Sequence, residues 1–421
     1  MDSYILATSM MNEHHTKRYS GSLWWYQDGR YFNDGVDAPL FKQKIYSRSE
    51  GQQSKFVDEV LKQVIIRSEI IKDGTTFPIR FRNGVLDKGK FLTDTDPLQF
   101  TPYYIPVEYH RDVKPCPFVE DYINELTSGD EDYKNLLGEV LGYAFITDPG
   151  MIRALGKFFI FRGDGGNGKG TLLQIMKTMY GEQNCCSMSP DELKDDRYKS
   201  TLIGKLANLG DDIEPETFTT GQLKAMKNIS TADTVTTRRL YHEAISVTFT
   251  AKLYFASNSD NKSFEKGRAF QRRIVWLPMF NEVKKPDPNF ISKATTPEAL
   301  EYWVSYAVNG YFRLYERQEW SRSELVDEYN KAYHERNNPT AEFANDVKPD
   351  DIVDKTVKQV EDMFDSSGYE GTFSGKVFKE AVWDKWEIGI GVKRVTDEYS
   401  DYSTVRRVFM RQSDTTQALK H

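Results

Sequence analysis

The sequence predicts an α/β protein whose central part is built on a mostly parallel β-sheet. Between Phe158 and Met279, apolar strand-like runs alternate with loops and helix-like runs, which is the order that builds parallel sheets. Within this stretch the glycine-rich loop GDGGNGKGT runs from Gly163 to Thr171. The apolar run KFFIF precedes the loop and the helix-like run LLQIM follows it, which fits the same core.

Composition narrows the class of protein. The 421 residues suffice for two or three domains with hydrophobic cores. The net charge of −7 excludes a uniformly basic DNA-coating protein, so nucleic-acid binding would need local basic clusters. Three cysteines without a C-x-x-C pair argue against a disulfide framework. No apolar run approaches a membrane span and the polar start holds no signal-peptide core, so we expect a cytoplasmic protein without a membrane partner.

The region before the core is predicted to mix strands and helices. Residues 1–20 are polar and are expected to be a frayed end or a linker. Residues 23–106 are strand-like for the most part, with a hairpin turn at Asp28-Gly29. A helix is expected from about Ser54 to Ile71, because its apolar residues recur at helical spacing.

Helical spacing returns on both sides of the core. Residues 118–143 are predicted to be helical, and Pro149-Gly150 is expected to break the pattern. Residues 296–335 are predicted to be helical as well. Pro349 marks a boundary, after which residues 350–421 are predicted to form helix, helix and strands.

The chain therefore divides into five predicted parts. They are an N-terminal α+β region (1–115), a helical segment (116–150), the α/β core (151–290), a helical extension (291–348) and a C-terminal domain (349–421).

The glycine-rich loop has the spacing of a nucleotide-binding P-loop, Gly163-x-x-x-x-Gly168-Lys169. Glycines let the backbone N–H groups approach a polyphosphate, the following helix adds a favourable dipole, and the lysine reaches the β- and γ-phosphates. Gly170 takes the place where such loops usually carry Ser or Thr, and Thr171 follows it. We expect the nucleotide to be bound by Gly163, Asp164, Gly165, Gly166, Asn167, Gly168, Lys169, Gly170 and Thr171.

Two carboxylates end the next strand-like run, KLANLGDDI. One of Asp211 and Asp212 is predicted to bind Mg²⁺, directly or through water, and the other to orient or deprotonate the attacking water. Thr171 is a further candidate for the Mg²⁺ site, since the hydroxyl usual at position 170 is missing. The alternative is a pair of solvated turn aspartates.

Two further polar features follow in the core. The apolar run AKLYFAS ends in Asn258, whose amide can hydrogen-bond the γ-phosphate or the attacking water. Arg272 and Arg273 stand just before the last apolar run, and arginine stabilises charge on a transferring phosphoryl group, also from a neighbouring subunit. A turn asparagine and a surface ion pair are the alternatives.

A basic hairpin is predicted between the acidic run and the Asn-ended run. Two strand-like arms, from Val235 to Phe249, flank Tyr-His-Glu. Its basic and aromatic side chains are suited to a DNA backbone and its bases, and a solvated hairpin is the alternative. The candidate DNA-binding residues are Lys227, Arg238, Arg239, Tyr241 and His242.

The order of these features resembles the superfamily 3 helicases, ring-forming AAA+ motors of small viruses, phages and plasmids. P-loop, acidic strand end, basic hairpin, Asn-ended strand and arginine pair occur here in one order. The run from Gly166 to Lys169, with Asn before Gly-Lys, is most similar to the phage and poxvirus primase-helicase branch. Upstream, FRNGVLD, IPVEY and KPCPF are similar to the segment before the motor in that branch. Asp211-Asp212 departs from the single Glu that is common there.

The resemblance implies an AAA+ ATPase core and an ATP-driven DNA helicase. It implies ATP and Mg²⁺ as cofactors, single-stranded or forked DNA as partner, and a homo-oligomeric ring, expected to be a hexamer, in the host cytoplasm if the source is phage or viral. Lys169, Asp211, Asp212 and Asn258 would act in cis, and Arg272 or Arg273 in trans. In the family, a primase or primase-polymerase domain frequently precedes this region and a winged-helix-like domain often follows it.

Two other functions stay open at the level of sequence. Gly-Lys-Gly-Thr also occurs in nucleoside monophosphate kinases, so a nucleotide kinase is one alternative. An ATP-switched DNA-loading module that does not unwind DNA is the other. The kinase explains neither the Asn-ended strand nor the basic hairpin.

Overall fold

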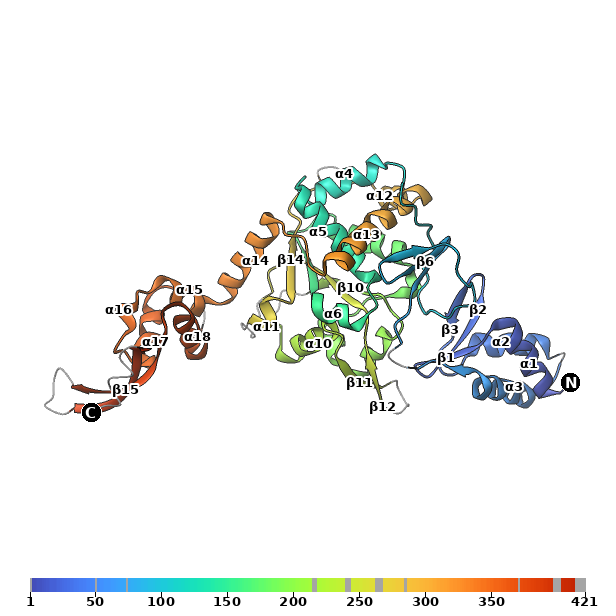
Figure 1. The fold of residues 1–421 in the computed structure, drawn as a ribbon, viewed down its shortest axis with the longest axis horizontal. Helices are drawn as coiled ribbons and strands as arrows, with labels where there is room; N and C mark the ends of the chain where they lie inside the picture. Colours follow the sequence, from blue (N-terminus) through green and yellow to red (C-terminus); the bar gives the residue numbers. More distant parts are fainter. Residues whose placement is uncertain are drawn as a thin grey trace. The chain divides into compact units, whose positions relative to one another are not determined.

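The computed structural model resolves two compact units, which are described separately (Figure 1). Unit 1 comprises Met1–Asn261 and Arg272–Asp327, and unit 2 comprises Lys262–Gln271 and Glu328–His421. The structure describes residues 2–49, 51–72, 75–213, 218–238, 244–261, 268–283, 286–369, 372–396 and 403–412.

A five-stranded parallel sheet forms the centre of unit 1 and confirms the predicted α/β class. Its strand order is β14-β8-β13-β10-β9, and every neighbouring pair is parallel. The central strands are continuous apolar runs because both faces of the sheet are covered. The strands are β8 (Phe158–Arg162), β9 (Cys185–Cys186), β10 (Ala207–Ile213), β13 (Lys252–Ser257) and β14 (Ile274–Pro278).

Helices connect and cover these strands. Those within the core are α7 (Lys169–Tyr180), α8 (Pro190–Lys194), α9 (Asp196–Lys199) and α10 (Thr220–Ser230). Those that flank it are α4 (Pro117–Leu126), α5 (Glu131–Gly142), α6 (Pro149–Leu155), α12 (Phe290–Ala294) and α13 (Pro297–Arg317). A single hydrophobic cluster runs from these helices into the sheet.

A buried ion cluster joins α5 to α13. The Glu139 carboxylate is fully buried and accepts hydrogen bonds from Arg313 Nε (3.2 Å) and from Arg317 Nη2. The backbone N–H and the hydroxyl of Ser321 donate to the same carboxylate, each at 2.7 Å. The charge is therefore paired and fully hydrogen-bonded, as a buried carboxylate requires.

The N-terminal residues form a packed layer. Residues 1–20 were expected to be a frayed end or linker, and this prediction is wrong: Leu6, Ala7, Met10 and His14 of α1 are buried. The layer pairs α1 (Ser3–His14), α2 (Pro39–Arg48) and α3 (Ser54–Arg67) with the sheet β3-β2-β1-β4. Its strands are β1 (Lys17–Tyr19), β2 (Ser22–Gln27), β3 (Arg30–Asn33) and β4 (Glu69–Ile70). The predicted β2–β3 hairpin at Asp28-Gly29 is confirmed.

Three helix boundaries differ from the predictions. The helix that begins at Ser54 ends at Arg67 rather than Ile71, because the following residues form β4 and pair with β1. The stretch 118–143 is two helices, separated where Ser128 and Gly129 adopt positive φ. Pro149 begins α6 instead of breaking a helix, since proline suits the first helical position.

A small antiparallel sheet and a hairpin complete unit 1. The sheet is β5-β6-β7, formed by Ile79–Phe81, Gly84–Asp87 and Lys90–Leu92. The predicted basic hairpin has its two arms, β11 (Thr234–Arg238) and β12 (Ala244–Thr248), in antiparallel register. Its tip, with Arg239, Tyr241 and His242, lies outside the described residues.

Unit 2 has its own hydrophobic core beneath a long hairpin. The stretch 296–335 is interrupted after α13, and α14 (Glu324–Asn337) leads into this unit. Its further elements are α11 (Arg268–Gln271), α15 (Pro339–Asp346), α16 (Pro349–Ile352), α17 (Val357–Ser366), α18 (Gly375–Trp386), β15 (Ile388–Thr396) and β16 (Ser403–Arg411). Asp354 N and Lys355 O bond to Phe409, which adds a short third strand-like segment to the hairpin. Among the described residues, no helix is long and apolar enough to cross a membrane.

Candidate functional site

The glycine-rich loop joins the carboxyl end of β8 to the first turn of α7, which begins at Lys169. A Cβ at Gly163 would stand 2.2 Å from the Met279 carbonyl oxygen, so only glycine fits beside the exit of β14. Gly168 caps α7 with a left-handed φ of 82°, which glycine adopts without strain. Asp164, Gly165 and Gly166 form the exposed tip. The loop therefore presents backbone rather than side chains at a helix N-terminus, as an anion site requires.

The side chain of Lys169 points back toward the start of the glycine-rich loop. Its side chain is buried, and its Nζ donates to the Gly163 carbonyl at 2.7 Å. From the other side, the Tyr122 hydroxyl of α4 donates to the Gly168 carbonyl at 2.8 Å. Burial raises the pKa of Tyr122 well above its usual value, so this phenol stays a donor. The two hydrogen bonds fix both ends of the loop.

An ion pair with Arg162 offsets the negative charge of Asp164 in the glycine-rich loop. Arg162 Nη1 donates to Asp164 at 2.7 Å and its Nε donates to Asp260 at 3.0 Å. A free carboxylate at Asp164 would repel a phosphate bound to the neighbouring amides. Pairing with Arg162 reduces that repulsion.

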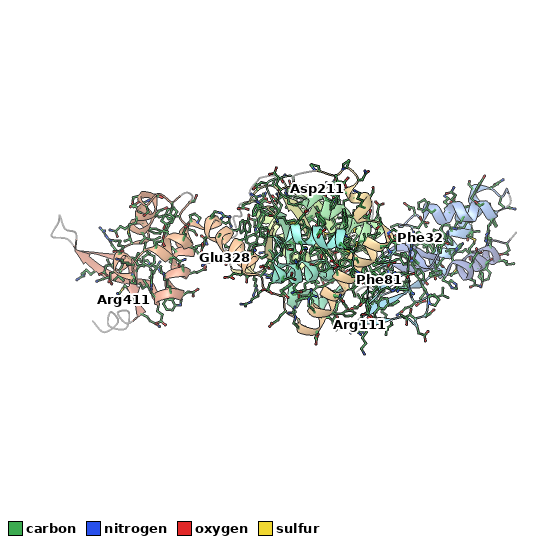
Figure 2. All side chains as sticks on the ribbon, turned by 90° about the horizontal axis from the view of Figure 1, so that it is seen from above. Phe32, Phe81, Arg111, Asp211, Glu328 and Arg411 are labelled. Atoms are coloured by element: carbon green, nitrogen blue, oxygen red, sulfur yellow. The ribbon has the colours of Figure 1, made fainter. Side chains whose placement is uncertain are left out.

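The acidic end of β10 reaches the start of α7. The β10–β13 register shifts between Gly210 and Ile213, so Asp211 and Asp212 form a bulge, and bulges re-aim side chains. The Asp211 carboxylate oxygens lie 3.8 and 3.9 Å from the position of a Cβ at Gly170. Asp211, labelled in Figure 2, is exposed, whereas the side chain of Asp212 lies outside the described residues. The missing hydroxyl at 170 thus leaves room beside a carboxylate, and Thr171 is half-buried one position later.

Asn258 directly follows β13, the strand between β8 and β10. Because carboxyl ends of parallel strands share one edge, the glycine-rich loop, Asn258 and Asp211 lie along the same edge of the sheet. Ser257, buried at the end of β13, donates to the Ser259 carbonyl at 2.8 Å and fixes the turn that carries Asn258. The side chain of Asn258 is exposed.

Arg272 and Arg273 lie at the amino ends of the parallel strands, whereas the glycine-rich loop, Asn258 and Asp211 lie at the carboxyl ends. They precede β14, and the Phe158 amide at the start of β8 donates to the Arg273 carbonyl at 2.8 Å. A five-residue strand spans about 16 Å, so neither arginine reaches the loop of its own chain. Arg272 is exposed and Arg273 is half-buried, and both line a polar pocket of about 780 Å³ together with Arg153, Lys157 and Arg322.

The root of the basic hairpin is anchored to α9. The buried Thr237 hydroxyl donates to the Asp196 carbonyl at 2.5 Å, and Val247 is buried opposite Val235. Arg238 is exposed at the end of β11. Lys227 is half-buried in the last turn of α10, the helix before the hairpin.

A pocket of about 500 Å³ adjoins the glycine-rich loop. It is bounded by Tyr122, Glu125 and Leu126 of α4, by Asn281–Val283 after β14, and by Asn167 of the loop. The segment after β14 is tied to the loop, since the Val283 amide donates to the Gly166 carbonyl at 3.0 Å.

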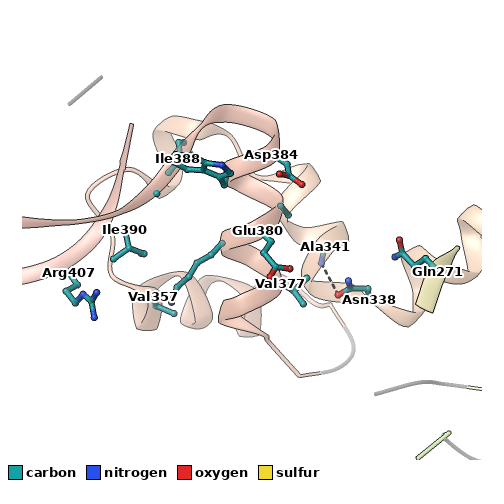
Figure 3. A pocket seen from close by; sticks show the side chains of 14 residues that line it. Gln271, Asn338, Ala341, Val357, Val377, Glu380, Asp384, Ile388, Ile390 and Arg407 are labelled. Carbon is teal, nitrogen blue, oxygen red and sulfur yellow. Dashed lines mark hydrogen bonds between the residues drawn. The ribbon is translucent and has the colours of Figure 1, made fainter. Parts of the chain in front are cut away.

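A larger concavity of about 970 Å³ lies within unit 2 (Figure 3). The close-up shows α18 and the first residues of β15 forming its walls, with Val357, Ile388 and Ile390 among the apolar lining. The carboxylates of Glu380 and Asp384 also line it. Its walls contain no glycine-rich loop, so the chemistry described above belongs to unit 1.

Sequence reasoning missed three residues that shape the loop: Tyr122, Arg162 and Asn281. Tyr122 lies far upstream in a helix with ordinary core spacing, and no local pattern distinguishes it. Arg162 stands between the apolar run KFFIF and the loop, and a basic residue two positions before Asp164 was the signal that the sequence offered. Asn281 accepts from Asn167 through its carbonyl and donates to the Glu125 carbonyl, contacts that depend on the tertiary fold.

Cys185 and Cys186, which form β9, are not candidate nucleophiles. Burial raises the pKa of the Cys185 and Cys186 thiols to about 12, so both stay protonated at neutral pH.

Comparisons with known proteins found a match to one family model over part of the chain and a likeness to solved structures over most of it. A model of a family of unknown function (DUF5906) matches residues 161–273, the stretch from the glycine-rich loop to Arg273. No curated protein matches the sequence. Two apo structures of the NrS-1 C-terminal region, one of them covering its residues 305–718, each align with 97% of this chain and 99% of theirs. The TM-scores are 0.55 at 12% identity and 0.52 at 11% identity, so the likeness establishes a shared fold.

Proposed function

We propose that this protein is an ATP-driven DNA helicase that works as a homo-oligomeric ring in the DNA replication of a phage, virus or plasmid. The observation that carries the proposal is the row of groups along one edge of the parallel sheet. The glycine-rich loop, Asn258 and Asp211 follow one another there in the order of neighbouring strands β8, β13 and β10. This row supplies a phosphate cradle, an amide and a carboxylate at the carboxyl ends of three neighbouring strands.

The residues of this row have distinct tasks in hydrolysis. The loop amides and Lys169 bind the β- and γ-phosphates, for which Lys169 leaves the Gly163 carbonyl. Asp211 beside Gly170 would hold Mg²⁺, whose charge offsets that of the phosphates, and Asp212 would share this role or activate water. Asn258 orients the attacking water or senses the γ-phosphate.

The position of the arginine pair supports assembly into a ring. Because Arg272 and Arg273 lie at the far edge of the sheet, a catalytic role requires the nucleotide of a neighbouring subunit. Arg272 is exposed and is the better placed of the two. The hairpin is held at its root by the hydrogen bond from Thr237 to α9, and its sequence includes Arg238 and Arg239, so it is suited to tracking a DNA backbone.

A forked-duplex assay tests the proposal. The protein is incubated with ATP, Mg²⁺ and a forked duplex carrying a fluorophore and a quencher, and strand separation is followed. We expect ATP-dependent separation and none with a non-hydrolysable analogue. DNA-stimulated hydrolysis without separation would favour a loading module, and phosphoryl transfer to a nucleoside monophosphate would favour a kinase.

A further inference from the structure

We propose that the pocket between α4 and the segment after β14 holds the base of the nucleotide, and that it selects a base carrying an amino group, such as adenine. This inference rests on the proposed nucleotide binding at the glycine-rich loop. It adds a second half to the ligand site, formed by residues outside the loop motif: Tyr122, Glu125, Leu126, Asn281, Glu282 and Val283.

The pocket and the loop are parts of one continuous site. Asn167 lines the pocket and lies two residues before Lys169. The Val283 amide donates to the Gly166 carbonyl at 3.0 Å, and Asn167 Nδ2 donates to the Asn281 carbonyl at 3.3 Å. A ligand whose phosphates lie on the loop therefore reaches the pocket with its other end.

The pocket is preformed. Asn281 Nδ2 donates to the Glu125 carbonyl at 2.6 Å, which fastens the segment after β14 to the end of α4. Tyr122 is held by Gly168 at its hydroxyl and by the Phe290 ring, with centroids 4.8 Å apart, at its side. A volume of about 500 Å³ lies within the ~300–1,000 Å³ usual for small-molecule sites. Little ordering is then needed on binding.

The residues that line this pocket suit a nucleotide base and would repel a phosphate group. Tyr122, Leu126 and Val283 give apolar walls for the faces of a ring. The Glu125 and Glu282 carboxylates repel a polyphosphate but accept hydrogen bonds from an amino group.

The test fills the pocket without changing any residue of the glycine-rich loop, and the backbone N–H of Val283 that donates to Gly166 is kept. Val283 is 38% exposed, so Val283→Trp places an indole in the pocket at small cost in packing. The matched control is Ile291→Trp, at a position of α12 that is 41% exposed and does not line the pocket. Binding of ATP and of inorganic tripolyphosphate, each with Mg²⁺, is measured by calorimetry on the full chain.

We expect Val283→Trp to weaken ATP binding about tenfold or more and to change tripolyphosphate binding less than about twofold, while Ile291→Trp changes neither. We further expect wild-type protein to bind inosine triphosphate, whose base has a carbonyl in place of the amino group, several-fold more weakly than ATP. Equal losses for ATP and tripolyphosphate, or no loss for either, would overturn the base assignment. A wild-type protein that binds neither ligand would instead refute the nucleotide site itself.

Discussion

Glu139 offers the sharpest test of how the flanking helices are held to the core. Its carboxylate is fully buried and accepts from Arg313, from Arg317 and twice from Ser321. Glu139→Ala removes a charge and leaves the Ser321 amide without this acceptor, an unsatisfied group that costs ~1–3 kcal/mol.

The exposure of Arg313 and Arg317 determines how much unfolding free energy Glu139→Ala costs. Removing one partner of a buried ion pair costs ~3–5 kcal/mol when the other charge stays buried. The side chains of Arg313 and Arg317 are 31% and 45% exposed, so they can turn to water. We therefore expect Glu139→Ala to lose about 3 kcal/mol of unfolding free energy, at the lower end of that range. Glu139→Gln keeps an acceptor for Ser321 and should lose about half as much, because neutral hydrogen bonds are roughly half as strong.

Urea unfolding followed by tryptophan fluorescence measures these losses, since Trp320 hydrogen-bonds the Leu155 carbonyl near the cluster. Glu131→Ala on the same helix is the control, because its ion pair with Lys134 is exposed and such pairs contribute ~0–1 kcal/mol. If Glu139→Ala unfolds at the same urea concentration as Glu131→Ala, the cluster does not hold α5 and α13 together.

Three further results are expected. Arg238→Ala should weaken DNA binding and lower the slope of log affinity against log salt by about 1, and an unchanged slope would place the phosphate contact elsewhere. Arg272→Ala should abolish hydrolysis, because Arg272 is the better placed of the two arginines to act in trans. Mixing inactive Arg272→Ala with inactive Lys169→Ala should restore part of the hydrolysis, and no recovery despite subunit exchange would exclude action of Arg272 in trans. Burial lowers the pKa of His14 in the folded protein, so as the pH falls the unfolded chain binds a proton at His14 before the folded protein does. The stability of the folded protein is therefore full above about pH 6.5 and falls below it. His14→Phe should remove this loss between pH 6.5 and 5 in thermal unfolding, and an identical loss would assign it to another group.

The sequence was sufficient for the α/β core because its signals are local. Apolar runs bounded by loops gave β8, β13 and β14, and the hairpin arms β11 and β12 follow from alternation. The helix α1 was missed because its buried residues are few and two of them are Ala7 and His14, so its apolar face is weak in sequence. Packing against α3, a tertiary effect, decides its structure.

The candidate site likewise contains residues that local sequence patterns predict and residues that only the tertiary fold brings together. The loop and the polar residues at strand ends are read from sequence because each directly follows an apolar run. Strand order is a non-local property, and it alone brings Asn258 between the loop and Asp211. Arg273 lies at the other end of the strands because it precedes β14, which runs parallel to β8. Tyr122 and Asn281 enter the site from distant segments, which no spacing rule connects to Gly168 or Asn167.

The central claim is that the glycine-rich loop binds and hydrolyses ATP in response to DNA. The measurement is the steady-state rate of phosphate release by the wild-type protein and by Lys169→Ala, each with and without single-stranded DNA. We predict that DNA accelerates the wild-type rate several-fold and that Lys169→Ala is inactive in both conditions while its thermal unfolding is that of a folded protein. A Lys169→Ala protein that releases phosphate at the wild-type rate would contradict the assignment of the loop and the function built on it.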